Sequence, residues 1–325
     1  MYNQTEAILS QYEIEIQGVA KGRGAFICDT SKGMKLLVPF RGSKEKGLLL
    51  SRFLARLEEQ GFFVEQIDFT KNGEAVAEDA YTGERFLLKS YVQGTEISTS
   101  RLEEMKEAVR ILAIYHNLSE KIDQQEDFLY QREDTMEILH RHYKELIKVK
   151  NYIRNRKKKN EFEQIYMRHF EHNRKSAEAS LVMLEEVSAH FDRRVVCHGD
   201  FNQHNILQCD GRYQMVHFEN FEYNWPMIDL SNFVRKMLEK NEWNEKMGRE
   251  LIAEYSKYRF LQEEEMKQLY GLLLFPEKFW KVTNHYMNSR KTWISGRDID
   301  KLKKVIEQEE KRLIFMENVF SFQKE

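Results

Sequence analysis

The first hundred residues alternate between short apolar runs and turn-forming residues, a pattern typical of a small antiparallel sheet. The apolar runs cover residues 12–16, 25–28, 35–40, 62–69, 75–79 and 85–91. Turn signals such as Asn72-Gly73 and Thr82-Gly83 separate them. Between residues 48 and 59 the apolar positions instead follow helical spacing, and Gly61 follows as a C-terminal cap. These positions predict a small lobe made of strands and one helix.

The segment Gln93-Gly94-Thr95 ends this pattern and predicts a hinge, because nearly everything after it follows helical spacing. One amphipathic helix is expected at 102–118, and two or three long helices between 126 and 191. Short strands are then expected at 193–197, 206–207 and 213–218, before helices return from residue 230. We therefore predict a small lobe over residues 1–92 and a large helical lobe over residues 93–325.

Composition agrees with a helix-rich protein of one large domain or two lobes. The chain has 325 residues, only 15 Gly and 3 Pro, and 32% of its residues are charged. Lys and Arg number 51 against 53 Asp and Glu, so no overall field attracts nucleic acid or an anionic membrane surface. No apolar run approaches the ~20 residues of a membrane span, and no signal peptide is evident, so we expect a cytosolic protein. The three cysteines lack zinc-site or disulfide spacing, and buried or idle thiols are expected.

The strongest chemical signal is the segment from His198 to Asn205, His-Gly-Asp-Phe-Asn-Gln-His-Asn, in a loop between predicted strands. A phosphotransferase needs a carboxylate that orients or deprotonates the acceptor hydroxyl, and an oxygen ligand for a divalent metal ion. Asp200 fits the first role and Asn205 the second. His198 is expected to hold this catalytic loop in place through hydrogen bonds between its ring and the backbone. For His204, substrate contact and a surface position are equally open.

With Ile206-Leu207 after it, this loop resembles the HxDxxxxN catalytic loop of the aminoglycoside/choline kinase superfamily, and Asp229-Leu230 resembles a structural element of the same superfamily. The resemblance implies an α+β, two-lobed protein-kinase-like fold of the aminoglycoside phosphotransferase type. The small antiparallel-sheet N-lobe would be nucleotide-binding-like, and the large, mainly helical C-lobe would carry loop 198–205. An active member would use ATP and Mg²⁺. Asp229 is expected to be an N-cap or loop-bracing carboxylate rather than a metal ligand.

A narrower resemblance covers nearly the whole chain and points to the CotS family of kinase-like, spore-coat-associated proteins of endospore-forming bacteria. The features that carry it, in chain order, are Gln60-Gly61-Phe62, Tyr91-Val92-Gln93-Gly94, the long basic helical insertion, the segment 275–280, Asn284-His285-Tyr286 and the C-terminal helix. The resemblance implies a protein made in the mother-cell cytoplasm and deposited on the spore coat. Its partners would be coat proteins or a small-molecule acceptor.

Two positions depart from what a working kinase of this kind requires. The first is in the stretch Val216-His217-Phe218-Glu219, where His217 takes the place of the metal-binding aspartate. Neutral imidazole is a poor ligand for Mg²⁺, which prefers oxygen, so metal affinity at His217 should fall. Glu219 lies two residues further, on the same side if this stretch is a strand, and is the candidate replacement ligand.

The second departure is in the strand at 35–40, which should offer a lysine to the nucleotide phosphates. Pro39 occupies the expected position, and it has neither a charge nor a backbone donor. Lys35 and Arg41 share its facing and are the candidate replacements, with Tyr91 at the hinge as a further candidate for cofactor binding. The glycine-containing turn at 18–24 is either a plain hairpin or a loop that covers phosphate, and the hairpin is favoured.

Three other features have an ordinary structural explanation that we favour. The basic run at residues 154–159 is expected on a solvated helix face or in a helix-connecting loop rather than against an acidic partner. The pair Phe279-Trp280 is expected in the core rather than at an acceptor site. Glu45 is the nearest candidate for a helix glutamate that pairs with the phosphate-binding lysine, and a surface position is favoured for it.

Two functional hypotheses follow. The favoured one is a pseudokinase of the spore coat with impaired or absent phosphotransferase activity and a structural, assembly or binding role. A lost metal carboxylate removes most of the electrostatic stabilisation on which phosphoryl transfer depends. The alternative is an active ATP-dependent phosphotransferase acting on a small-molecule or protein hydroxyl, with Asp200 as base and with Asn205 and Glu219 as metal ligands. ATP and Mg²⁺ are the cofactors in the active case, and none is needed in the other.

Overall fold

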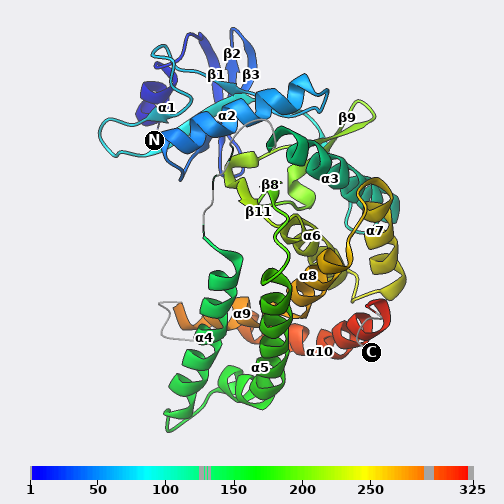
Figure 1. Cartoon of the computed structure of the whole chain (residues 1–325). Helices are drawn as coiled ribbons and strands as arrows, with labels where there is room; N and C mark the ends of the chain where they lie inside the picture. Colours follow the sequence, from blue (N-terminus) through cyan, green and yellow to red (C-terminus); the bar gives the residue numbers. More distant parts are fainter. Residues whose placement is uncertain (1, 124–127, 129, 131–132, 289–295, 321–325) are drawn as a thin grey trace. The chain divides into compact units, whose positions relative to one another are not determined.

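A computed structural model of the chain describes residues 2–123, 128, 130, 133–288 and 296–320 (Figure 1). The chain divides into two compact units, each built from separate stretches of sequence. The first unit contains residues 1–98, 111–130 and 195–223, and the second contains residues 99–110, 131–194 and 224–325. The lobe boundary expected between residues 92 and 93 stays a prediction. Within the described ranges, no helix has the length and apolar character that a membrane crossing requires.

The first unit contains the predicted sheet, and all of its strand pairings are antiparallel. The strands run in the order β1 (Ile16–Lys21), β2 (Phe26–Thr30), β3 (Gly33–Pro39), β6 (Arg85–Ser90) and β4 (Ile67–Asp68), and β5 (Ala77–Glu78) also pairs with β6. The first strand begins later than predicted. A helix that the sequence pattern did not predict, α1 (Tyr2–Leu9), comes before it, and Tyr12 packs with this helix in the core instead of forming a strand.

The register of the central strands assigns their side chains to two faces of the sheet. Leu37 lies opposite Leu88, and both pack against α1 in one apolar cluster. Leu36 lies opposite Lys89, one position along, so this pair belongs to the other face. Odd-numbered residues of β3, Lys35 among them, therefore share the α1 face, and even-numbered ones share the opposite face.

Helix α2 (Lys44–Glu59) confirms the helix predicted in the small lobe and begins four residues earlier. Ser43 caps its N-terminus by accepting a hydrogen bond from the backbone N–H of Lys46 at 3.1 Å. Phe53 of this helix is fully buried and packs on the rings of Tyr115 and Phe221, which fixes α2 within the first unit. Glu45 is exposed in the first turn, as predicted.

Two smaller sheets complete the first unit around the predicted catalytic loop. One has the strand order β10 (Arg212–Met215), β9 (Ile206–Cys209), β7 (Thr95–Glu96), and the other pairs β11 (Glu222–Asn224) with β8 (Val195–Cys197). Short 3₁₀ helices, η1 (Gln203–Asn205) and η2 (Phe218–Asn220), lie between these strands. The strand predicted at 213–218 ends at Met215, because His217 adopts a left-handed φ of 67° and η2 starts directly after it.

The second unit is helical. It contains α4 (Thr135–Arg154), α5 (Glu161–Ser188), α6 (Met227–Lys240), α7 (Glu245–Tyr258), α8 (Glu263–Leu274), α9 (Glu277–Asn288), α10 (Gly296–Val319) and the first turns of α3 (Leu102–Asp123). Phe279 is buried in an apolar cluster of α4, α5, α9 and α10, and Trp280 packs against the same cluster. The predicted core position of this aromatic pair is confirmed.

The basic run at residues 154–159 lies at the end of α4 and in the turn that leads to α5. Its side chains are exposed or half-buried, and Arg156 pairs with the buried carboxylate of Glu163 at 2.6 Å. Glu163 also completes a capping box with Asn160 at the start of α5. The predicted solvated, helix-connecting position is therefore confirmed.

Candidate functional site

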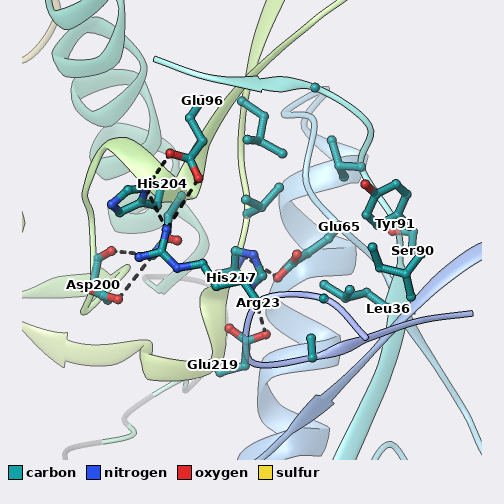
Figure 2. A pocket seen from close by; sticks show the side chains of 18 of the residues that line it. Arg23, Leu36, Glu65, Ser90, Tyr91, Glu96, Asp200, His204, His217 and Glu219 are labelled. Carbon is teal, nitrogen blue, oxygen red and sulfur yellow. Dashed lines mark hydrogen bonds and ion pairs between the residues drawn. The ribbon is translucent and has the colours of Figure 1, made fainter. Parts of the chain in front are cut away.

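The first unit contains a pocket with a cavity volume of about 510 Å³, and all of its lining residues belong to that unit. The main sheet and the turn between β1 and β2 contribute one part of the lining. The catalytic loop, residues 198–205, and the segment 216–220 contribute another. Figure 2 shows that the polar side chains from both parts point into the same space.

Asp200 and Asn205 are held together by the catalytic loop, and both line the pocket. Nδ2 of Asn205 donates to the backbone oxygen of Asp200 at 2.8 Å and to its Oδ2 at 3.3 Å. Nδ2 of Asn202 donates to Oδ1 of Asp200 at 3.0 Å. Because the NH₂ group of Asn205 is used in this way, its oxygen is the atom left for another partner.

His198 is fully buried beneath the catalytic loop and does not line the pocket. Its Nε2 donates to the backbone oxygen of Val216 at 2.9 Å, and its Nδ1 accepts from the backbone N–H of Asp200 at 3.2 Å. The predicted hydrogen bonds from this ring to the backbone are confirmed. A catalytic role for His198 itself stays a prediction.

The floor of the pocket contains a buried lysine, Lys89 of β6, whose side chain is 1% exposed. Its Nζ donates to Oε1 of Glu65 at 2.8 Å, to Oε1 of Glu219 and to Nδ1 of His217 at 3.2 Å. An ammonium group has three N–H donors, so this set of acceptors uses all of them. Glu65, His217 and Glu219 line the pocket, and Lys89 lies behind them. We call these four residues the floor cluster.

Charge pairing controls protonation in the floor cluster. Burial alone would lower the pKa of Lys89, but the carboxylates of Glu65 and Glu219 outweigh burial, so the Lys89 pKa is raised above its usual value. Burial would likewise raise the pKa of Glu219, but the charge of Lys89 holds it well below its usual range. Lys89 is therefore charged and Glu219 ionised near neutral pH.

His217 is fixed in an unusual conformation by the floor cluster. Oε1 of Glu65 accepts from the backbone N–H groups of His217 at 2.8 Å and Phe218 at 3.1 Å, which ties the left-handed turn in place. Since the Lys89 ammonium can only donate, Nδ1 of His217 must be the accepting nitrogen, and the ring proton is on Nε2. The imidazole therefore has no free lone pair for a metal ion in this arrangement.

A second polar group lies at the Asp200 side of the pocket. Nη1 of Arg23, in the turn between β1 and β2, is 3.3 Å from Nδ1 of His204 and 3.9 Å from Oε1 of Glu96. Nδ1 of His204 also contacts Oε2 of Glu96. Figure 2 shows the guanidinium group of Arg23 directed towards Asp200. His204 thus lies in the pocket lining. The turn that carries Arg23 is a hairpin closed by a Gly22 N–H to Ala25 oxygen bond of 2.9 Å, and because this turn also lines the pocket, phosphate contact by it stays an open alternative.

Of the three residues predicted to bind cofactor, only one lies in the pocket lining. Tyr91 lines the pocket, whereas Lys35 and Arg41 do not. The register explains the difference, because Lys35 faces α1 and its Nζ donates to Oδ1 of Asp68 at 2.9 Å. Arg41, of the same parity, is exposed beyond the end of β3. Cofactor binding by these three residues stays a prediction.

Sequence reasoning missed Lys89 and Glu65, the two most buried members of the floor cluster. A charged residue inside the otherwise apolar stretch Phe86-Leu87-Leu88-Lys89 was the available signal. Glu65 was less visible, because it belongs to an irregular segment and its partners lie 24 and 152 positions away. Both residues could be recognised only from the strand register and the tertiary contacts of the folded chain.

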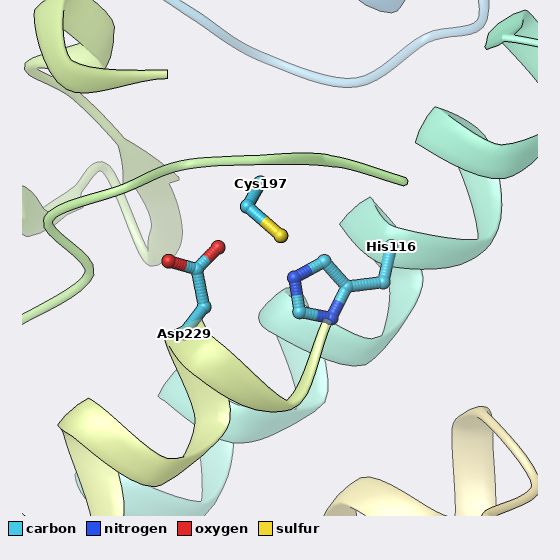
Figure 3. Close-up of side chains that lie close together, drawn as sticks. All are labelled: His116, Cys197 and Asp229. Atoms are coloured by element: carbon cyan, nitrogen blue, oxygen red, sulfur yellow. The ribbon is translucent and has the colours of Figure 1, made fainter. Parts of the chain in front are cut away.

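Asp229, the other carboxylate considered from the sequence, belongs to the second unit. It is fully buried in the first turn of α6, where Pro226 and not Asp229 is the N-cap residue. A carboxylate in a first helical turn is stabilised by the helix dipole. Figure 3 shows the side chain of Asp229 on α6. None of the three cysteines, all of which the structure describes, forms a disulfide, and Cys28 and Cys197 are buried.

The family described as "Spore coat putative kinase YutH" matches residues 5–319 of this chain. The chain belongs to this family. Spore coat protein S of Bacillus subtilis (strain 168), a relative of this YutH-family chain, is 23% identical over 327 residues, which cover 96% of the chain and 92% of the relative. The resemblance to spore-coat-associated, kinase-like proteins is thereby confirmed.

Solved structures confirm the fold expected for the YutH-family chain. An aminoglycoside phosphotransferase from Alicyclobacillus acidocaldarius matches with a TM-score of 0.82 at 18% identity, covering 97% of this chain and 94% of that one. Amicoumacin kinase hAmiN, in complex with AMP-PNP, Ca²⁺ and Ami, matches with a TM-score of 0.66 at 12% identity, covering 98% and 95%. The chain has the aminoglycoside-phosphotransferase-type kinase fold, with an N-terminal antiparallel sheet and a mainly helical C-terminal part. Structural relatives of the YutH-family chain bind ATP analogues and metal ions.

Proposed function

We propose that this chain is a kinase-like component of the spore coat with impaired phosphotransferase activity, and that it acts by binding, in a structural or assembly role. The observation that carries the proposal is the state of His217. It stands where the superfamily places its metal-binding aspartate, and its Nδ1 accepts a hydrogen bond from Lys89 at 3.2 Å. A nitrogen lone pair that accepts a hydrogen bond from an ammonium group cannot at the same time coordinate a metal ion.

The residues of the pocket floor do not fit Mg²⁺. Its ligands should be oxygen atoms in near-octahedral geometry. His217 offers nitrogen, and that nitrogen is engaged, while Oε1 of Glu219 is held by Lys89. The amide oxygen of Asn205 and the second oxygen of Glu219 are the remaining candidates among these residues. Because the predicted metal set is depleted in this way, we assign no catalytic step to a metal ion.

An active phosphotransferase is the second candidate, and the catalytic loop is the observation that favours it. Asp200 receives hydrogen bonds from the side chains of Asn202 and Asn205, which fix its carboxylate in the pocket lining. A fixed carboxylate at this place could orient an acceptor hydroxyl and accept its proton. This alternative predicts measurable turnover that depends on Asp200.

The two candidates are separated by His217→Asp. Aspartate tolerates the left-handed φ of 67° better than most residues, so the turn should persist. The new carboxylate would add an oxygen ligand beside Glu219. If the absence of a carboxylate at residue 217 limits activity, ATP hydrolysis with Mg²⁺ should rise at least about tenfold over the wild type. Phosphate release under steady-state conditions measures it.

His217→Asn is the matched control, because asparagine also accepts the left-handed conformation but brings no charge, and its hydrolysis rate should stay at the wild-type value. Asp200→Ala in the His217→Asp background should abolish the gain. Wild-type hydrolysis that Asp200→Ala removes, with no increase in His217→Asp, would refute the proposal and leave the active phosphotransferase as the function.

The coat assignment has its own test. A fluorescent fusion of the full chain, expressed under its own promoter in its endospore-forming host, should collect around the developing spore after synthesis in the mother cell. The His217→Asn and Asp200→Ala fusions should localise in the same way, since a binding role does not need turnover. Fluorescence that stays diffuse in the mother cell throughout sporulation would contradict a role in the coat.

A further inference from the structure

The floor cluster places a permanent positive charge at the carboxylate that a metal ion would need. Nζ of Lys89 contacts Oε1 of Glu219, and the exposed fraction of the Lys89 side chain is 1%. Glu219 is also largely buried, with 16% of its side chain exposed. A charge pair shielded from water in this way is screened much less than a pair at the surface. The pair therefore persists at ordinary ionic strength.

Lys89 cannot easily leave this position. Its other partners are Glu65, 3% exposed, and Nδ1 of His217. Withdrawal of the ammonium would leave the carboxylate of Glu65 buried with backbone N–H donors alone, and removing one partner from a buried ion pair is strongly unfavourable. The pairing of Lys89 with Glu65 thus anchors the ammonium beside Glu219.

The anchored ammonium opposes a second cation at Glu219. A divalent ion on the free oxygen of this carboxylate would lie within a few ångströms of Nζ, in a buried region where like charges repel strongly. It would also share a single carboxylate charge with Lys89. Lys35, the lysine of β3, does not contribute to the charge balance at Glu219, because it lies on the α1 face and pairs with Asp68.

We propose that Lys89 acts as an internal cation that occupies Glu219 in place of a divalent metal ion, and that it lowers the affinity of the pocket for metal. The inference rests on the proposed binding role of the pocket and explains how its floor is stabilised without a metal ion. Lys89 itself is a specificity-determining residue of the site. It comes from β6, the strand before the predicted hinge, and not from β3, where a pocket lysine was expected.

The test is Mn²⁺ binding to the full chain without nucleotide, followed by electron paramagnetic resonance of the free ion. The wild type should bind Mn²⁺ weakly. Lys89→Met should bind it at least about tenfold more tightly, because a competing charge has been removed. Adding Glu219→Gln to Lys89→Met should return the affinity to the wild-type value. Lys35→Met, which removes a lysine from the other face of the sheet, should leave the isotherm unchanged.

Lys89→Met leaves Glu65 without its ion-pair partner and could unfold the chain. The double variant Lys89→Met, Glu65→Gln avoids this, because the glutamine oxygen can still accept from the N–H groups of His217 and Phe218. Its Mn²⁺ affinity should show the same gain, with the melting curve as a check of folding.

Two results would overturn the inference. One is tight, stoichiometric Mn²⁺ binding by the wild type that neither Lys89 variant changes. The other is a gain of affinity that persists after Glu219→Gln, since the ion would then bind elsewhere. The proposed loss of turnover is decided separately, by hydrolysis rates in the His217 variants. A failure of this inference can therefore be distinguished from a failure of the proposed function.

Discussion

Glu65→Ala is expected to lower the free energy of unfolding by about 3 to 5 kcal/mol, the usual cost of breaking a buried ion pair by removing one partner. Oε1 of Glu65 accepts from Nζ of Lys89 and from the backbone N–H groups of His217 and Phe218. The substitution leaves the Lys89 ammonium, 1% exposed, with one carboxylate instead of two. Urea unfolding followed by circular dichroism measures the loss.

Glu74→Ala provides the matched control for this prediction. Glu74 pairs with Lys44 at 2.9 Å, but both side chains are nearly half exposed, at 45% and 44%. An exposed pair of this kind contributes at most about 1 kcal/mol. If Glu65→Ala costs no more than Glu74→Ala, the floor cluster does not stabilise the fold, and the buried-pair argument is wrong.

Gly199→Ala is expected to destabilise the chain by roughly 2 to 5 kcal/mol and to displace the catalytic loop. Gly199 has a φ of +78°, which costs an L-residue about 1 to 2 kcal/mol, and overpacking adds about 1 to 3 kcal/mol. A Cβ here would lie 2.0 Å from the backbone oxygen of Asn220. The obstacle is backbone rather than a flexible side chain, so relief requires the loop before Asp200 to move.

Gly211→Ala separates the two contributions. Gly211 has nearly the same φ, +75°, but nothing lies within 4 Å of a Cβ placed there. Its substitution should therefore cost only the conformational part, about 1 to 2 kcal/mol. Equal losses of unfolding free energy in the two variants, measured by urea titration, would show that the close contact between the new Cβ and Asn220 is relieved without cost.

The catalytic loop could be predicted from the sequence because its determinants are local. His198, Asp200 and Asn205 lie within eight consecutive positions, between two strands that end and begin close by. Hydrogen bonds inside the loop then fix Asp200 and Asn205 together, with the amide of Asn205 2.8 Å from the backbone of Asp200. The motif and the hydrogen bonds that shape it lie within the same short stretch, so the spacing of its residues was enough to predict the loop.

The pocket floor could not be predicted in the same way. Lys89 meets Glu65 across 24 positions and Glu219 across 130, and these meetings depend on which faces of the sheet the residues share. The alternation along β3 indicated which of its side chains share a face of the sheet. It did not indicate that the odd-numbered residues face α1. Short α1 was missed for a related reason, since its position is decided by packing of Ile8 and Leu9 against the sheet.

The first unit is assembled from three separate stretches of chain, and this has a consequence for synthesis on the ribosome. About one hundred residues lie between Glu96 and Asp200, so at ~5–20 residues per second the finished sheet waits roughly 5 to 20 s for the loop that completes its pocket. During that interval Lys89 has Glu65 but not yet Glu219. A nascent or truncated chain that stops before residue 195 therefore exposes a half-built floor to chaperones and proteases, although its N-terminal strands are already made.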